Sequence, residues 1–207
     1  MRPIHAALVL SLALQPIGAG VAQEIKSRPM PRGVVVQAAV ERFPVSGASI
    51  EAISQGLRSA VNAEGGFLGH YFVSWRYTYR MTDGSGRAGC RLQNVRVDMQ
   101  TRIRVPEWRV SPDAPEDVAA AWTTFQTAFE NHVREHENNA IRTAGDFVQK
   151  LERMTDMSCR QLGLDVQREA KSASDRLQDR QKKLDEDTQH GARTGARWPP
   201  RPPPPQP

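Results

Sequence analysis

The chain has 207 residues, of which 39% are hydrophobic and 25% are charged, and its formal net charge is +5 at pH 7. This composition is ordinary for a globular domain, and it excludes a chain that is disordered throughout and a protein with several membrane spans. Seven of the 15 prolines lie in the last nine residues, so we expect a folded body followed by a proline-rich tail.

The first 22 residues have the pattern of a secretory signal peptide. Arg2 precedes an apolar run from Ala6 to Leu14, and small residues follow as far as Ala22. The apolar run is too short to span a bilayer, and no later segment approaches the roughly 20 apolar residues that a spanning helix needs. We therefore expect a periplasmic or secreted protein with no membrane association after cleavage; an uncleaved anchor is the alternative.

The rest of the chain divides into three parts. A short polar lead (23–33) precedes one domain (34–196), and the proline-rich tail (197–207) is expected to be disordered. Lysine and arginine are interleaved with aspartate and glutamate along the whole chain, so we expect no nucleic-acid partner.

The first half of the domain is predicted to contain three strands and a short helix. A valine-rich run from Val34 to Val40 is the first strand, and a turn is expected at 43–47. Ser49 then caps a helix of two to three turns. Residues 71–80 and 95–105 alternate between apolar and polar side chains on either side of a turn, which predicts a long antiparallel hairpin.

The second half of the domain is predicted to be helical. Apolar residues recur at steps of three or four from Pro115 to Arg153, and a second such pattern runs from Val166 to Leu184. The expected fold class is therefore α+β, with a small antiparallel sheet packed against two long amphipathic helices.

Cys90 and Cys159 are the two cysteines of the chain. In an exported protein a lone pair of cysteines most often forms a disulfide, so we predict this pairing. Two free thiols or a metal-binding pair are the alternatives.

Three histidines are candidate metal ligands. His132 and His136 lie in the apolar stripe of the first long helix, about 40° and one turn apart, so both imidazoles can reach one ion. Burial of the pair with a hydrogen bond to a carboxylate is the alternative. His190, at an exposed helix end, is the best remaining histidine for a third ligand, although a solvated histidine at that position is equally consistent with the pattern.

A zinc hydrolase also needs a general base, which is commonly a glutamate directly after the first histidine. Val133 occupies that position. Glu135 lies about 80° to the other side of the site direction, whereas Glu137 is about 120° away and points too far from it. Residues 132–136 therefore form an inverted zinc motif with Glu135 as the candidate catalytic base.

The order of several short motifs resembles the bacterial secreted zinc-dependent proteases catalogued as domain of unknown function 922. In chain order, the motifs are Phe43-Pro44-Val45-Ser46-Gly47, Val73-Ser74-Trp75-Arg76-Tyr77, Cys90, Pro106-Glu107-Trp108, Trp122-x-x-Phe125, His132-x-x-x-His136, Cys159 and Leu184-Asp185-x-Asp187-Thr188-x-His190-Gly191. The resemblance runs from about Val34 to Ala196.

The resemblance implies a zincin-like metalloprotease arrangement, Zn²⁺ as the cofactor and a peptide or protein substrate. It maps His132 and His136 onto the two histidines of a His-Glu-x-x-His motif, and it favours His190 as part of the site. The chain departs from that motif at Val133, which stands in place of the catalytic glutamate, and this departure bears on catalysis more than on fold or metal. The rival hypothesis is a non-enzymatic envelope protein that binds a partner through a strand edge or its proline tail.

Overall fold

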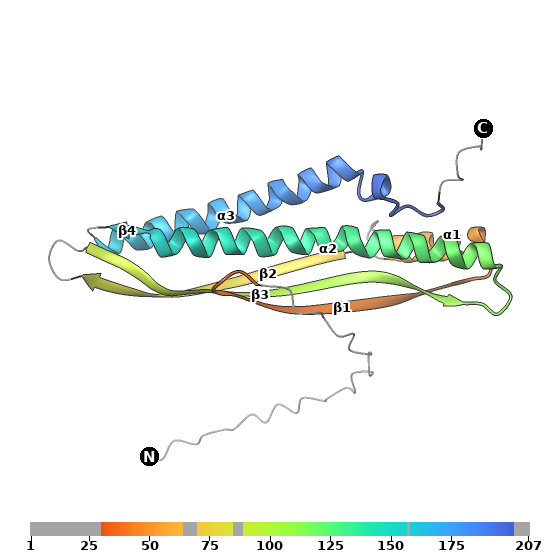
Figure 1. Ribbon diagram of the computed structural model, residues 1–207, viewed down its shortest axis with the longest axis horizontal. Coiled ribbons are helices and arrows are strands. Elements are labelled where there is room, and N and C mark those ends of the chain that lie inside the picture. Colours follow the sequence, from red (N-terminus) through yellow and green to blue (C-terminus); the bar gives the residue numbers. More distant parts are fainter. Residues whose placement is uncertain (1–29, 64–69, 85–88, 157, 201–207) are drawn as a thin grey trace, which may run out of the picture.

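The computed structural model describes residues 30–63, 70–84, 89–156 and 158–200. Its elements are β1 (Val34–Gly47), α1 (Ile50–Ala63), β2 (His70–Gly84), β3 (Gly89–Val110), α2 (Glu116–Arg153), β4 (Thr155–Asp156), α3 (Cys159–Thr188) and the 3₁₀ turn η2 (Ala192–Thr194). The strands form one layer, and α2 and α3 cover one face of it (Figure 1). The predicted α+β class and the two long helices are confirmed.

The sheet has the strand order β1-β3-β2, and the short β4 pairs with the start of β3. β2 and β3 form the predicted antiparallel hairpin, which pairs from His70 opposite Arg104 to Gly84 opposite Gly89, with a register shift between Thr78 and Arg80. β1 lies on the other side of β3, and the two strands are parallel from Val34 opposite Val97 to Gly47 opposite Val110.

The sheet is therefore mixed, and the prediction of an antiparallel sheet was wrong for β1. Side chains alternate in the same way in parallel and antiparallel strands, so the pattern of Val34–Val40 carries no information about direction. The predicted turn at 43–47 was also wrong, because these residues continue β1. Pro44 is tolerated there since β1 is an edge strand, where a missing N–H need not break a ladder hydrogen bond.

α2 begins and ends within one residue of the predicted boundaries, whereas α3 begins at Cys159, seven residues before the predicted start, and α1 has 14 residues, more than the two to three turns predicted. α1 is capped by Ser49, whose hydroxyl accepts a hydrogen bond from the Ala52 amide. α2 follows Pro115, with acidic residues in its first turn that complement the helix dipole. α3 is capped by Ser158 and ends where Gln189 adopts a left-handed conformation.

The Cys90–Cys159 disulfide is formed, as predicted, with a Cα–Cα distance of 5.1 Å. It joins the first turn of α3 to the start of β3, and Cys90 is fully buried. Cys90 belongs to the same buried cluster as Val97 and Met99, further along β3, and Phe147 of α2.

A second core lies between α1, the far ends of β1 and β3, and the N-terminal half of α2. The C-terminal segment contributes to it, because the Trp198 ring packs edge-on against Trp122 and its Nε1–H donates to the Ser54 hydroxyl at 3.1 Å. The packed body thus extends beyond residue 196, the predicted end of the domain. The predicted signal peptide, most of the polar lead and residues 201–207 of the tail lie outside the described residues.

Within the described ranges, no helix combines the length and apolar character that crossing a membrane requires.

Candidate metal centre

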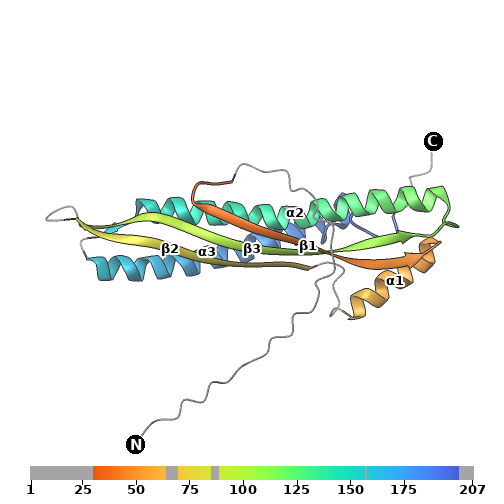
Figure 2. The same cartoon turned by 90° about the horizontal axis from the view of Figure 1, so that it is seen from below.

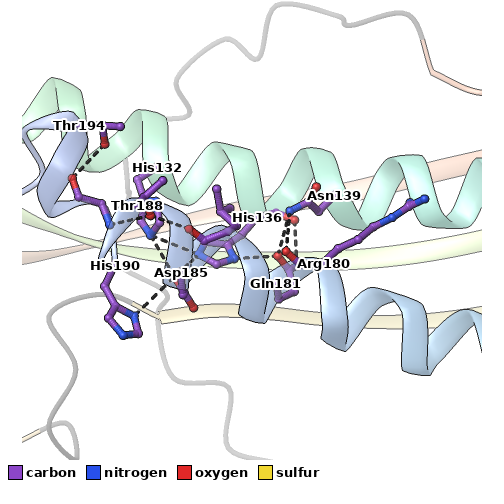
Figure 3. A network of polar contacts seen from close by, with 11 residues as sticks. His132, His136, Asn139, Arg180, Gln181, Asp185, Thr188, His190 and Thr194 are labelled. Carbon is purple, nitrogen blue, oxygen red and sulfur yellow. Dashed lines mark hydrogen bonds and ion pairs between the residues drawn. The ribbon is translucent and has the colours of Figure 1, made fainter.

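The last turns of α3 lie against the middle of α2, and they bring three metal-ligating side chains together. His132 and His136 project from α2 towards Asp185 of α3 (Figure 3). One ligand atom from each residue lies within 4.8 Å of the others. The two predicted histidines therefore meet a carboxylate from another helix.

The three ligand atoms form a nearly equilateral triangle. His132 Nε2 lies 3.3 Å from His136 Nε2, and Asp185 Oδ1 lies 3.3 Å from His132 Nε2 and 3.1 Å from His136 Nε2. Tetrahedral zinc with bonds of about 2.0–2.1 Å holds its ligand atoms about 3.3 Å apart. The spacing therefore matches one face of a tetrahedral zinc site.

Gln181 fixes which nitrogen of His136 carries a proton. The Gln181 amide Nε2 donates to the His136 backbone carbonyl at 3.0 Å, so its Oε1 faces His136 Nδ1 at 2.7 Å. Because that oxygen can only accept, Nδ1 is the protonated nitrogen and Nε2 of the neutral ring carries a lone pair. An acceptor that binds the N–H on the far side of the ring orients a histidine ligand towards a metal.

The two imidazoles are shielded from water, whereas Asp185 is partly open. The side chains of His132 and His136 are 8% and 12% exposed, against 30% for Asp185. Burial lowers the pKa of His132, and the adjacent His136 adds to this effect. The neutral imidazole is therefore favoured, which leaves a second nitrogen lone pair for a cation. Asp185 opposes this shift through its charge and a hydrogen bond to His132, so without a cation an imidazole N–H would face the Asp185 carboxylate in place of the metal.

His190 lies at the solvent edge of this cluster. Its Nδ1 is 3.5 Å from Asp185 Oδ1, and its side chain is 79% exposed. The backbone supports the position, because the His190 amide donates to the Asp185 carbonyl at 2.8 Å. The structure thus brings the third predicted histidine to the site, although the compact triangle uses Asp185.

Gly191 packs directly on the His132 ring. A Cβ at this residue would lie 2.9 Å from His132 Cγ and 2.8 Å from the Ala196 methyl group, and its φ of +82° disfavours any side chain. We expect Gly191→Ala to lose about 1–2 kcal/mol of stability from the backbone alone. It should also weaken zinc binding on the order of tenfold, because His132 must move.

Gly195→Ala is the matched control for this prediction. Gly195 has a similar φ of +94°, but its added Cβ would meet only the Ala128 methyl group, at 3.3 Å. Urea denaturation should show a loss of stability in both variants. Competition with a zinc chelator should show weaker zinc binding only in Gly191→Ala. Equal zinc affinity in the two variants would show that Gly191 does not affect the metal site.

The residues predicted around the catalytic base point elsewhere. Glu135 is half exposed, accepts a hydrogen bond from Asn138 at 2.9 Å and lies 3.8 Å from Arg142. Val133 is 5% exposed and belongs to the apolar core near α1. Glu137 is buried against the sheet, where the Thr101 hydroxyl donates to it at 2.8 Å. None of the three belongs to the compact cluster.

Sequence reasoning did not propose Asp185 as a ligand. In the sequence, Asp185 was noted only as part of the motif at 184–191 that carried the family resemblance. Its four-residue spacing from Gln181 places both residues on one face of α3, but which turn of α3 faces His132 depends on how the two helices dock.

Comparison with protein-family models identifies the family of the chain. The model of a family described as bacterial protein of unknown function, DUF922, matches residues 40–191, which is most of the chain. The chain belongs to the DUF922 family. Neither the curated proteins nor the solved structures yield a match. In this DUF922 protein the matched range includes both histidines, Asp185 and His190.

Proposed function

We propose that this DUF922 protein is an exported zinc-binding protein that hydrolyses peptide bonds at the His132–His136–Asp185 site. The observation that supports the proposal is the triangle of ligand atoms, with edges of 3.1–3.3 Å and a lone pair directed by Gln181. Three protein ligands with a further position open are typical of catalytic rather than structural zinc sites.

The residues of the chain divide the roles as follows. His132, His136 and Asp185 would hold the ion, and zinc bound there would supply Lewis-acid chemistry at neutral pH. His190 is exposed beside Asp185, so a change of its rotamer would make it a further ligand or a hydrogen-bond partner of substrate. Export is supported by the disulfide, which is consistent with an extracytoplasmic location.

Glu135 keeps the proposed role of general base, and it must leave Asn138 and Arg142 to act. We expect Glu135→Gln to retain zinc and to lower peptide hydrolysis by at least about a hundredfold, because proton transfer by a positioned base contributes on that scale. Cleavage of an unstructured protein substrate, followed in the presence of zinc and of a chelator, measures this. Glu152→Gln, on the same helix but near its far end, is the control. Undiminished cleavage by Glu135→Gln would remove Glu135 from the mechanism.

A second candidate function is zinc binding without hydrolysis, in a protein that kept the fold to bind a partner. One observation favours it: Val133, at the position of the usual glutamate, is buried in an apolar core. Zinc content together with cleavage that does not exceed the chelated sample would support this second function over the first.

A further inference from the structure

The face of the sheet opposite α2 and α3 is rich in arginine, and it is the side seen in Figure 2. Alternation turns every second residue of β2 and β3 away from the helices, because their neighbours in sequence are buried or half-buried. The side chains on this outer side, which we call the arginine face, include Arg76, Arg80, Arg91, Arg96, Arg102 and Arg104. Arg104 is half-buried, and the other five are exposed.

The arginine face carries a net positive charge. The same side presents two acidic residues, Glu41 and Asp98, against the six arginines. This count covers the described residues of β2, of β3 as far as Arg104, and of the segment of β1 opposite them. Along the sequence these arginines alternate with apolar and acidic residues. The strands sort them to one side, which explains why the sequence showed no basic patch.

Several of these guanidinium groups are held against the sheet surface. Arg102 lies over the Phe72 ring at 4.7 Å from its centroid and 3.5 Å from Glu41, and Arg96 donates to Asp98 from both Nε and Nη2. Ordering of this kind reduces the entropy that each side chain loses when it binds a ligand. The remaining N–H donors match phosphate oxygens in geometry.

The shape of the surface distinguishes among phosphate-bearing partners. β2 and β3 run for 15 and 22 residues, so at about 3.3 Å per residue the face is roughly 50–70 Å long. It also exposes two apolar side chains, Phe72 at 46% and Val35 at 39%. Single-stranded nucleic acid would need several aromatic rings for base stacking, but Phe72 is the one exposed aromatic side chain among the described residues of this face.

We propose that the arginine face binds the phosphate headgroups of an anionic lipid bilayer, with Phe72 and Val35 entering the headgroup layer. A long cationic face with scattered apolar side chains suits an extended anionic surface. The contact is peripheral and needs no spanning helix, so it differs from the sequence-based expectation that the mature protein has no membrane association. It is independent of the proposed zinc site, because the arginine face and the histidine cluster use different side chains.

Co-sedimentation with vesicles of phosphatidylcholine, with and without phosphatidylglycerol, tests this proposal on the chain that begins at Gln23. We expect binding only to the vesicles that contain phosphatidylglycerol, and weaker binding at higher salt. The combined variant Arg76→Gln, Arg80→Gln and Arg91→Gln should bind on the order of a hundredfold more weakly, at roughly fivefold per charge.

The matched control removes three charges from the exposed surface of α3. Arg168→Gln, Lys171→Gln and Lys182→Gln change side chains that are 73%, 78% and 77% exposed. The control should bind like the unmodified chain, and both sets should keep the unmodified melting temperature. A chelator should leave vesicle binding unchanged, which separates this result from any failure of the zinc proposal.

Three results would overturn the proposal: equal binding to neutral vesicles, equal losses in the two variant sets, or no vesicle binding at all. A labelled single-stranded oligonucleotide is included in the same assay. Binding of the oligonucleotide that the Arg76, Arg80 and Arg91 variant loses, without vesicle binding, would assign the face to nucleic acid instead.

Discussion

Loss of the Cys90–Cys159 disulfide is expected to lower the free energy of unfolding by about 4 kcal/mol. The bond closes a loop with a sequence separation of 69, and in the chain-entropy model a loop of this size stabilises the native state by about that amount. A domain of this size has a total stability of only about 5–15 kcal/mol. The bond is therefore a large part of what keeps the connection between α2 and α3 on the sheet.

Urea denaturation of the Cys90→Ala, Cys159→Ala variant measures the effect. Reductant provides the internal control, because it should destabilise the unmodified chain by a similar amount and leave the variant unchanged. This comparison removes the contribution of the lost sulfur packing. Thiol titration of the unfolded, non-reduced chain should find no reactive thiol. Equal urea midpoints for the variant and the unmodified chain would show that the disulfide contributes little.

Zinc is expected to stabilise the folded chain, and replacement of the paired histidines should abolish this effect. At a free zinc concentration a hundred times the dissociation constant, binding to the native state alone adds about 2.7 kcal/mol. For a protein of this size that raises the melting temperature by roughly 5–10 °C. The combined variant His132→Ala and His136→Ala should melt at the same temperature with zinc and with a chelator.

The control variant Arg134→Ala and Asn138→Ala has the same four-residue spacing on α2, outside the metal cluster. In thermal denaturation scans, it should keep the full zinc-dependent rise in melting temperature. A zinc-dependent rise that survives in the histidine variant would show that the ion binds elsewhere. No rise in any variant would mean that the His136–Asp185 contact is held by a proton and not by a metal.

Local pattern predicted the elements of this fold better than their arrangement. Alternation along Val95–Val105 and the helical stripe from Val118 to Leu151 depend on residues near one another in sequence, and both predictions were confirmed. The direction of β1 was not predictable in the same way. It depends on how the chain returns after α1, which no periodicity records.

The candidate site was likewise predictable from the sequence only where it depends on local spacing. His132 and His136 were predictable because a four-residue step places them on one helix face. Asp185 comes from 49 residues further along the chain, so its contact depends on the docking of α3 against α2. The base was the least predictable part, because Glu135 and Val133 are symmetric about the site on a helical wheel and only packing decides which neighbours each one meets.

The zinc content of the purified chain from Gln23, after dialysis against a buffer of low free zinc, tests the central claim most directly. If His132, His136 and Asp185 form the site, elemental analysis should find about one zinc per chain, and Asp185→Asn should retain much less. An unmodified chain without stoichiometric zinc, or an Asp185→Asn variant with as much zinc as the unmodified chain, would contradict this account.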